Sequence, residues 1–454
     1  MLTAAETVGR RTLLDHPRGL WVLTGTELWD RISFHGMQAL LTLYMVEYLL
    51  LPGHIERIAG FALYRSLLES ITGPLSVAAL ASQTFGIYVG LVYFTPVLGG
   101  ALGDRLIGRR AGVIAGALLM TAGHFCMAFD AAFLAALLLL ILGAGLLRGN
   151  LAPQVTTLYA QGDRRQSDAF QLFYVGINLG AFIAPLVTGT LAVVYGWHFG
   201  FGFAGIGMLI GLVIYLAGQH LLPHDEQRRA TRVRERLTPQ ERHRLAALGL
   251  LFIIAICFWV AQSQVWNVYN LWVRDHVDLT FGTFKVPVPW LQALDGLAPI
   301  LVMPPCLALW RWQAARGREP DDLGKIALGA LIFGAGTALL AIAPLMTAAT
   351  GRVSLIWPIA FHITSNTGWL FFTPTMEALF ASKAPAGLRG TLMSTNLATV
   401  FLASLISGRL GGLYEQMSSA SFWLLHAAIV AGGGVAILAA RRPLRHLLGA
   451  SSTA

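Results

Sequence analysis

The stretch Gly25-Thr-Glu-Leu-Trp-Asp-Arg-Ile-Ser-Phe-His-Gly36 decides the fold, because it places three ionisable side chains inside an apolar run long enough to cross a membrane. At helical spacing, one face of about 100° carries Glu27, Asp30, Arg31 and Phe34. Ionisable groups at membrane depth cost at least ~2.5–3.5 kcal/mol each, so they persist mainly where they pair and face a watery cavity. We expect this face to point into the protein. It is either a static or snorkelling ion pair, or a proton or ion site.

The composition indicates a polytopic membrane protein. Of the 454 residues, 56% are hydrophobic and 12% are charged, about half the charged fraction of a soluble domain. The net charge of +9 does not indicate nucleic-acid binding, because the arginines gather in short segments between apolar runs. The positive-inside rule explains that distribution better.

Apolar runs of about 20 residues, the length that crosses ~30 Å of hydrocarbon, predict twelve transmembrane helices. We place them near residues 20–50, 75–102, 111–129, 131–151, 169–196, 198–221, 245–272, 289–312, 323–348, 354–381, 388–415 and 419–440.

The basic connections predict the orientation in the membrane. Arginine and lysine concentrate in 104–110, 163–168, 223–244, 311–325, 382–390 and the tail from Arg441. All of these fall on one side if each helix crosses once, so we expect both termini in the cytoplasm of a protein in the plasma (inner) membrane. The N-terminal segment lacks the apolar core of a secretory signal, and the first helix should target the chain.

The connection 223–244 divides the helices six and six. We expect an N-terminal lobe over 1–222, a basic cytoplasmic linker over 223–244 and a C-terminal lobe over 245–454. The halves also echo each other: Pro153 and Pro374 are each followed by leucine and alanine at matching offsets, and Asn178-Leu-Gly-Ala resembles Asn396-Leu-Ala-Thr. Such matches favour two structurally repeated lobes.

Five motifs together carry a resemblance to a known family. GTELWDRISFHGMQALLTLYM (25–45) resembles the ExxERFxYYG signature of the proton-dependent oligopeptide transporter family, a branch of the major facilitator superfamily. The other stretches are LVYFTPVLGGALGDRLIGRR (91–110), GAGLLRGN (143–150), FQLFYVGINLGAFIAPLVTG (170–189) and WLFFTPTMEALFASKAPAGLRGTLMS (369–394). The resemblance implies an all-α major facilitator fold of twelve helices in two six-helix lobes, and the chain looks like a divergent member that lacks the two extra central helices of many bacterial relatives.

The resemblance assigns Arg148 a place where the family carries a lysine that engages the substrate carboxylate. A guanidinium is a planar fork suited to a carboxylate or another oxyanion, and it does not give up its proton. A permanent salt bridge to Glu27 or Asp30 is the alternative, since a buried cation needs a partner either way. The two roles can alternate during a transport cycle.

Two further motifs suggest a substrate contact and a conformational latch. Tyr174 and Asn178 lie one turn apart in a segment that matches the family's YxGIN pattern, and they can hydrogen-bond a polar solute; helix packing through the neighbouring small residues is the alternative. In the loop over 100–110, glycines permit a tight turn while an acid can pair with arginines at a helix end. The implied latch consists of Asp104, Arg105, Arg109 and Arg110.

The second half departs from the family pattern. Ser263 stands where the family's acidic proton site would be, and Trp369 stands where a glutamate would hold the amino group of a peptide. Two new acids appear nearby, Asp295 and Glu377. Either can replace the missing proton site, although Glu377 can also pair with the cytoplasmic Lys383. We favour Asp295.

Three histidines lie in apolar runs and can titrate near neutral pH. Lone helical histidines are more often packing residues, and we expect that role for His124 and His362; His35 has the better case, because it stands at the tyrosine of the family motif. Cys126, Cys257 and Cys306 show no paired spacing, so no disulfide or metal site is indicated. No convergent nucleophile or metal cluster points to an enzyme.

The sequence therefore predicts a proton-coupled secondary transporter that imports small peptides or peptide-like polar or anionic solutes by alternating access. The predicted proton-coupling residues are Glu27, Asp30, Arg31 and Asp295. The predicted substrate-binding residues are Arg31, Phe34, His35, Arg148, Tyr174, Asn178, Ser263 and Trp369. We expect a monomer in the lipid bilayer, a small-molecule or short-peptide substrate, no nucleic acid, and no cofactor besides the coupling proton. The alternatives are a carrier of a non-peptide anion or amino-blocked compound, an exporter, and a non-transporting membrane sensor.

Overall fold

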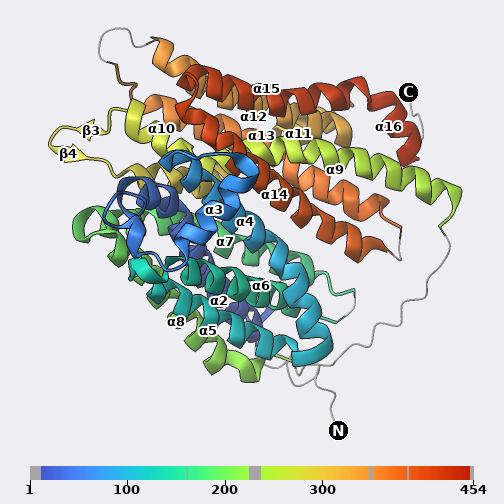
Figure 1. The fold of residues 1–454 in the computed structure, drawn as a ribbon. Helices are drawn as coiled ribbons and strands as arrows, with labels where there is room; N and C mark the ends of the chain where they lie inside the picture. The colour runs from blue at the N-terminus through green and yellow to red at the C-terminus, as the bar shows by residue number, and fades with distance from the viewer. Residues whose placement is uncertain (1–11, 161, 224–236, 347–350, 386–387, 450–454) are drawn as a thin grey trace. The chain divides into compact units, whose positions relative to one another are not determined.

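The computed structural model describes residues 12–160, 162–223, 237–346, 351–385 and 388–449, and almost all of their regular structure is helical (Figure 1). Within these ranges twelve α-helices have 18 or more residues, the number predicted from the apolar runs. Nine long helical segments of the described chain are also apolar enough to cross a membrane. The first long helix is not among the nine, because its charged residues interrupt the apolar run. The chain is an all-α polytopic membrane protein.

The chain divides into two compact units, one made of residues 1–77 and 91–230 and the other of residues 78–90 and 231–454. Residues 78–90 group with the second unit because they pack closely on one of its helices. A Cβ atom on Gly86 would lie 2.4 Å from the carbonyl oxygen of Ser404. Most of the predicted linker lies outside the described residues. Residues 239–244, predicted as linker, are helical.

The first unit consists of a short N-terminal hairpin and six long helices. In chain order its elements are β1 (Thr12–Leu13), β2 (His16–Pro17), α2 (Arg18–Tyr44), η1 (Met45–Leu49), η2 (Ile55–Arg57), α3 (Phe61–Thr72), α4 (Val77–Leu102), η3 (Gly103–Ile107), α5 (Arg109–Cys126), η4 (Asp130–Ala132), α6 (Phe133–Thr157), α7 (Arg165–Tyr195), α8 (Trp197–Gly218) and η5 (Gln219–Leu221).

Helix packing in the first unit depends on small residues. α2 packs on α7 and α8, and α5 packs on α6 and α8 (Figure 1). α4 approaches α6 so closely that a Cβ atom on Gly99 would lie 2.1 Å from the carbonyl oxygen of Gly145. Such contacts between helix backbones replace the hydrophobic driving force that lipid does not supply.

The second unit contains the other six long helices. Besides the first half of α4 it comprises α9 (Pro239–Trp266), α10 (Tyr269–His276), β3 (Thr280–Phe281), β4 (Phe284–Lys285), η6 (Val288–Gln292), α11 (Ala293–Ala314), α12 (Asp322–Ile342), η7 (Ala343–Met346), α13 (Ile356–Lys383), α14 (Arg389–Gly411), η9 (Gly412–Glu415), α15 (Ser419–Ala439) and α16 (Arg441–Leu448).

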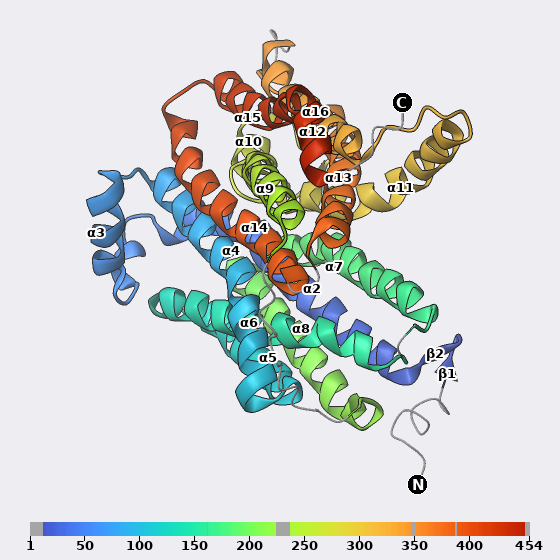
Figure 2. The ribbon, with the colours of Figure 1, turned by 90° about the vertical axis from the view of Figure 1, so that its right-hand side faces the viewer.

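The second unit repeats the packing of the first. α9 packs on α14 and α15, and α12 packs on α13 and α15 (Figure 2). These pairs correspond in chain order to α2 with α7 and α8, and to α5 with α6 and α8. The echoed prolines, Pro153 and Pro374, lie inside the corresponding helices α6 and α13. The repeat seen in the sequence is therefore present in the packing.

Two local features differ from the predicted helices. The helix predicted over 245–272 begins earlier, at Pro239, because Thr238 and Glu241 form a reciprocal capping box. It also breaks at Asn267, whose backbone leaves the helical region and whose amide donates to Ser82 Oγ at 2.7 Å. A further helix, α3, lies between glycines with positive φ, Gly60 and Gly73. It was missed because the prediction considered only runs long enough to span the membrane.

Candidate functional site

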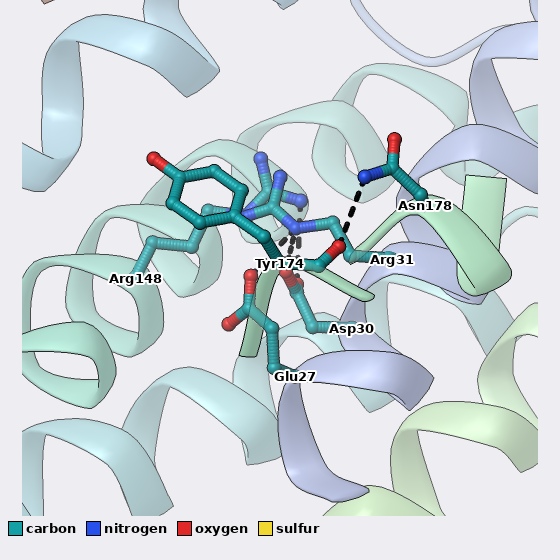
Figure 3. Close-up of polar contacts among 6 residues, drawn as sticks. All are labelled: Glu27, Asp30, Arg31, Arg148, Tyr174 and Asn178. Carbon is teal, nitrogen blue, oxygen red and sulfur yellow. Dashed lines mark hydrogen bonds and ion pairs between the residues drawn. The ribbon is translucent and has the colours of Figure 1, made fainter. Parts of the chain in front are cut away.

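The charged residues of α2 form a buried cluster. Arg31 Nε donates to Glu27 Oε1 at 2.6 Å, one turn away on the same helix (Figure 3). The Arg31 guanidinium also lies 3.6 Å from Asp30 Oδ2. The side chain of Asp30 is fully buried, that of Glu27 is 3% exposed and that of Arg31 is 16% exposed. The face expected to point into the protein does so.

Arg148 completes the cluster from α6. Its Nε donates to Asp30 Oδ2 at 2.9 Å and its Nη2 to Asp30 Oδ1 at 3.3 Å, a two-pronged contact between helices (Figure 3). The guanidinium carbon also lies 4.0 Å from the centre of the Phe34 ring, close enough for a cation–π interaction. Of the two predicted partners of Arg148, the structure pairs it with Asp30. Phe34 orients the same guanidinium.

The cluster is electrically neutral when both acids are ionised, because two carboxylates face two guanidinium groups. The two acids differ in their partners: Asp30 pairs with Arg31 and Arg148, whereas Glu27 pairs with Arg31. Guanidinium groups stay charged. A change in the charge of the cluster therefore has to occur at a carboxylate, and protonation of either acid leaves one guanidinium free to attract an anion.

α7 supplies the predicted polar face. The Asn178 amide donates to the Tyr174 backbone carbonyl at 3.0 Å, and the Tyr174 side chain is 54% exposed (Figure 3). α7 lies directly against α2, because a Cβ atom on Gly180 would lie 2.6 Å from Arg31 Cβ. The alternative role assigned to the small residues, helix packing, is present.

Two histidines border the cluster. Ser33 Oγ and His124 Nε2 form a short hydrogen bond that joins α2 to α5, and His124 interacts electrostatically with Asp30. This contact agrees with the hydrogen-bonded packing role predicted for His124. The partner helix was not predicted, since nothing in a lone histidine reveals which helix it faces. His35 packs beside the Phe34 ring, with ring centroids 5.2 Å apart.

The predicted latch joins helix ends within the first unit. Arg109 Nε donates to Asp104 Oδ1 at 2.7 Å, and Arg110 donates to the backbone carbonyls of Leu222 and Pro223, the second at 2.9 Å. Gly108, with φ of 83°, makes the turn that starts α5. The exposed Arg105 lies on the outer side of this turn. The loop thereby ties the start of α5 to the chain that follows α8.

The second unit carries a similar tie between helix ends, which no sequence motif predicts. Asp321, at the start of α12, accepts from Arg441 Nη2 at 2.6 Å and from Arg445 Nε at 2.7 Å. Partial burial would raise the pKa of Asp321, but the hydrogen bonds from both arginines and from the Gly324 backbone outweigh it and hold the pKa below its ordinary value.

Asp295 is the centre of a different cluster in the second unit. Trp266 Nε1, from the last residue of α9, donates to Asp295 Oδ2 at 3.0 Å, and Asn366 Nδ2, from α13, donates to Asp295 Oδ1 at 3.0 Å. His362 Nδ1 lies 3.6 Å from the same Oδ1. Asp295 is thus held by neutral donors and an imidazole.

The other predicted residues of the second unit lie on α9 and α13. Ser263 Oγ, on α9, is 3.4 Å from Ser404 Oγ on α14. Trp369 and Glu377 both lie on α13, each partly buried. In the described ranges no group of three or more His, Cys, Asp or Glu side chains is arranged to hold a metal ion.

Comparisons with known proteins agree on one family. The POT family model matches residues 110–234 and 224–424. The chain is 28% identical to a peptide transporter of Yersinia enterocolitica, with 91% of each protein covered. It is 26% identical to a di-/tripeptide transporter of Lactococcus lactis, over 97% of this chain and 98% of the relative.

A solved structure shows the same architecture over nearly the whole chain. It is a peptide transporter POT in complex with sulfate, with a TM-score of 0.84, 26% identity and 98% of each chain covered. The family resemblance drawn from the five sequence motifs is therefore confirmed. Since the family model matches well over half of the chain, this protein belongs to the POT family of membrane transporters.

Proposed function

We propose that the protein is a proton-coupled symporter that imports small peptides, or peptide-like solutes that carry an anionic group, by alternating access. The observation that carries this proposal is the buried, neutral cluster of two carboxylates and two guanidinium groups on α2 and α6. Ionisable groups at this depth are expensive, and in transporters they mark ion and substrate pathways. The family membership supports the same function.

Glu27 is the proposed proton acceptor. It has one arginine partner, Arg31, whereas Asp30 is paired with two. Neutralising Glu27 therefore breaks one ion pair and leaves the contact between α2 and α6 in place. Opposite charges nearby favour the ionised form of an acid, and protonation of Glu27 gives up one direct ion pair.

Arg31 and Arg148 are the proposed anion-binding groups. When Glu27 is protonated, the cluster carries one uncompensated positive charge, which the carboxylate of a substrate can neutralise. A guanidinium can bind a carboxylate through two parallel hydrogen bonds. The proton and the anion thus enter together without leaving a net buried charge, which is the electrostatic requirement for symport. The sulfate in the related structure is consistent with an anion-binding role for this family.

Trp369 favours a second candidate, transport of an amino-blocked or non-peptide anion. At this position the family resemblance implies an acid for the amino group of a peptide. An indole cannot form an ion pair with an ammonium group, although its face attracts a cation by ~0.5–2 kcal/mol. Burying an ammonium group without a carboxylate partner costs desolvation free energy. A substrate without a free amine then loses nothing at Trp369.

We infer from the basic connections that both termini are cytoplasmic. We also propose that the protein acts as a monomer in the inner membrane. The two ties described above, Asp104 with Arg109 and Asp321 with Arg441 and Arg445, belong to these connections. Arginine-rich segments near helix ends are retained on the cytoplasmic side.

Uptake into proteoliposomes tests the proposal. The full chain should accumulate a labelled dipeptide, dialanine, or its N-acetylated form when the lumen is more alkaline than the outside, and a protonophore should abolish accumulation. A matched vesicle without protein is the control. Binding of either compound without any flux would instead indicate a non-transporting sensor, and flux that ignores the pH gradient would contradict proton coupling.

A further inference from the structure

We propose that Asp295 and His362 form a second proton-binding site, in which the imidazole takes up one proton and closes an ion pair with the carboxylate. This inference rests on the proposed proton coupling and extends it to the second unit.

The contacts of Asp295 show why a proton matters here. Its two hydrogen-bond donors, Trp266 and Asn366, are neutral, so neither compensates the charge of the carboxylate. In the first unit, permanently charged arginines compensate the buried carboxylate of Asp30. Among the residues of the second unit that the structure describes, the ion-pair partner within 4 Å of Asp295 is His362, which is a cation only when it holds a proton.

His362 is fully buried, and its ring nitrogens lack hydrogen-bond partners among the described residues. Buried polar nitrogens are normally hydrogen-bonded, and exceptions often mark functional sites. Asp295 keeps 11% of its side chain exposed, which gives the pair an edge through which a proton can pass to and from water.

The distance between the two groups indicates that the ion pair is open in this structure. His362 Nδ1 lies 3.6 Å from Asp295 Oδ1, whereas a charge-assisted N–H to carboxylate bond closes to about 2.7–2.9 Å. Proton uptake changes the charge of the pair from −1 to 0 and attracts the imidazole toward the carboxylate. Because His362 belongs to α13 and Asp295 to α11, closure would draw these two packed helices together.

Among the described residues, Tyr269 of α10 is a further titratable group that interacts electrostatically with Asp295. Its ring lies edge-on to His362 with centroids 5.1 Å apart. Trp266, from α9, and Asn366, from α13, are neutral at every physiological pH. Trp266 is also the last residue before α9 breaks at Asn267. A change in the charge of the pair is therefore felt at the one place where this membrane helix is interrupted, and such interruptions in transporters accompany ion and substrate sites.

Nitrogen NMR of histidine-labelled full-length protein in nanodiscs tests the pair without any substrate. The His362 signal is the one that disappears in His362→Gln. In the wild type it should change from the neutral to the charged imidazole form when the pH is lowered, and in Asp295→Asn this change should be lost. His426→Gln is the matched control, since His426 is also buried in the second unit but bonds to Phe422 and Gln264; the His362 response should persist in it. A His362 that stays neutral in the wild type, or that responds equally in Asp295→Asn, would overturn the proposal.

Transport measurements then show whether proton uptake by Asp295 and His362 is coupled to substrate accumulation. In proteoliposomes, Asp295→Asn and His362→Gln should each lower proton-driven accumulation of dialanine by about tenfold or more, while counterflow exchange stays within about twofold. If wild-type protein shows no proton-driven flux, the proposed function fails while the NMR result still decides the pair. If Asp295→Asn loses binding of dialanine but keeps that of N-acetylated dialanine, Asp295 binds the amino group and the proton-site proposal is wrong.

Discussion

The two units of this transporter hold their buried carboxylates in opposite ways. In the first unit Asp30 lies between Arg31 and Arg148, two groups that never lose their charge. In the second unit Asp295 accepts from Trp266 and Asn366 and faces His362. The first site joins α2 to α6 and the second joins α11 to α13, so the shared element of the repeat is α6 with its counterpart α13. The comparison shows two ways to hold a buried acid in one fold. Where the partners are permanent cations, a change of charge has to occur at a carboxylate. Where the hydrogen-bond donors are neutral, a neighbouring histidine can take up the proton instead.

The largest expected effect is the loss of folding stability when Arg148 is removed from the first site. Arg148→Met leaves Asp30 buried with only the longer contact to Arg31, and removing one partner of a buried pair costs about 3–5 kcal/mol. Asp295→Asn should cost less, about 1–3 kcal/mol, because only a neutral donor loses its acceptor. Thermal unfolding of the purified variants measures the difference.

The double variant Asp30→Asn with Arg148→Met sharpens that test, because it removes both charges and should regain part of the lost stability. Arg165→Met is the matched control: Arg165 pairs with Asp163 at 2.8 Å on an exposed surface, and its loss should change the unfolding temperature little. Equal destabilisation by Arg148→Met and Arg165→Met would contradict the view that the Asp30–Arg148 ion pair contributes more to stability than an exposed pair.

A second prediction concerns ligand charge at the first site. Arg148→Ala should weaken binding of a carboxylate-bearing dipeptide by about 10–100-fold, the value of a hydrogen bond between charged groups, and should weaken binding of its amide much less. Arg148→Lys keeps the charge but loses the fork, so its loss should be intermediate. Isothermal titration of both ligands measures the ratio. Equal losses for acid and amide would assign Arg148 a structural role.

A third prediction concerns the amino end of a substrate. Trp369→Glu should shift preference from N-acetylated dialanine toward free dialanine by about 2–30-fold, since an ion pair replaces an interaction worth ~0.5–2 kcal/mol. Competition binding of the paired ligands measures the shift. A strong wild-type preference for the free amine that vanishes in Asp295→Asn would show that Asp295, and not the indole, decides amine recognition.

The smallest expected effect lies at the helix ends. The lowered pKa of Asp321 means that its carboxylate stabilises the folded protein at pH values above the ordinary range of an aspartate, and that this contribution is lost as the pH falls through the lowered pKa. Because Asp321 is partly exposed, the contribution should stay below about 1 kcal/mol and shrink in salt. Asp321→Asn retains the helix cap and isolates the charge.

The unfolding temperatures of wild type and Asp321→Asn should therefore differ slightly at neutral pH and converge below about pH 4.

The sequence predicted the first site better than the second for a physical reason. Three charges in an apolar run cannot face lipid, so the sequence alone predicts that Glu27, Asp30 and Arg31 face the protein interior. Their pairing with Arg148 depends on the register between α2 and α6, and the sequence left Glu27 and Asp30 open as partners. The helix count also followed from apolar length alone.

The second site was only half visible. Asp295 stood out as an acid in an apolar run, but His362 looked like a packing residue, because nothing in the sequence shows that α13 brings it to α11. The break of the seventh long helix at Asn267 was missed as well, since neither glycine nor proline marks it. Side-chain hydrogen bonds to other helices cause that break, and they become visible only in the folded chain.

The central claim is that protonation of Glu27 couples the proton to the substrate, and Glu27→Gln in proteoliposomes tests it most directly. The variant carries the uncharged form permanently, so it should no longer concentrate dialanine against a gradient when the lumen is alkaline, while counterflow exchange continues because exchange does not need proton release. Glu47→Gln, which removes an exposed acid just beyond α2, should behave like the wild type. Proton-driven accumulation by Glu27→Gln at the wild-type level would contradict the account.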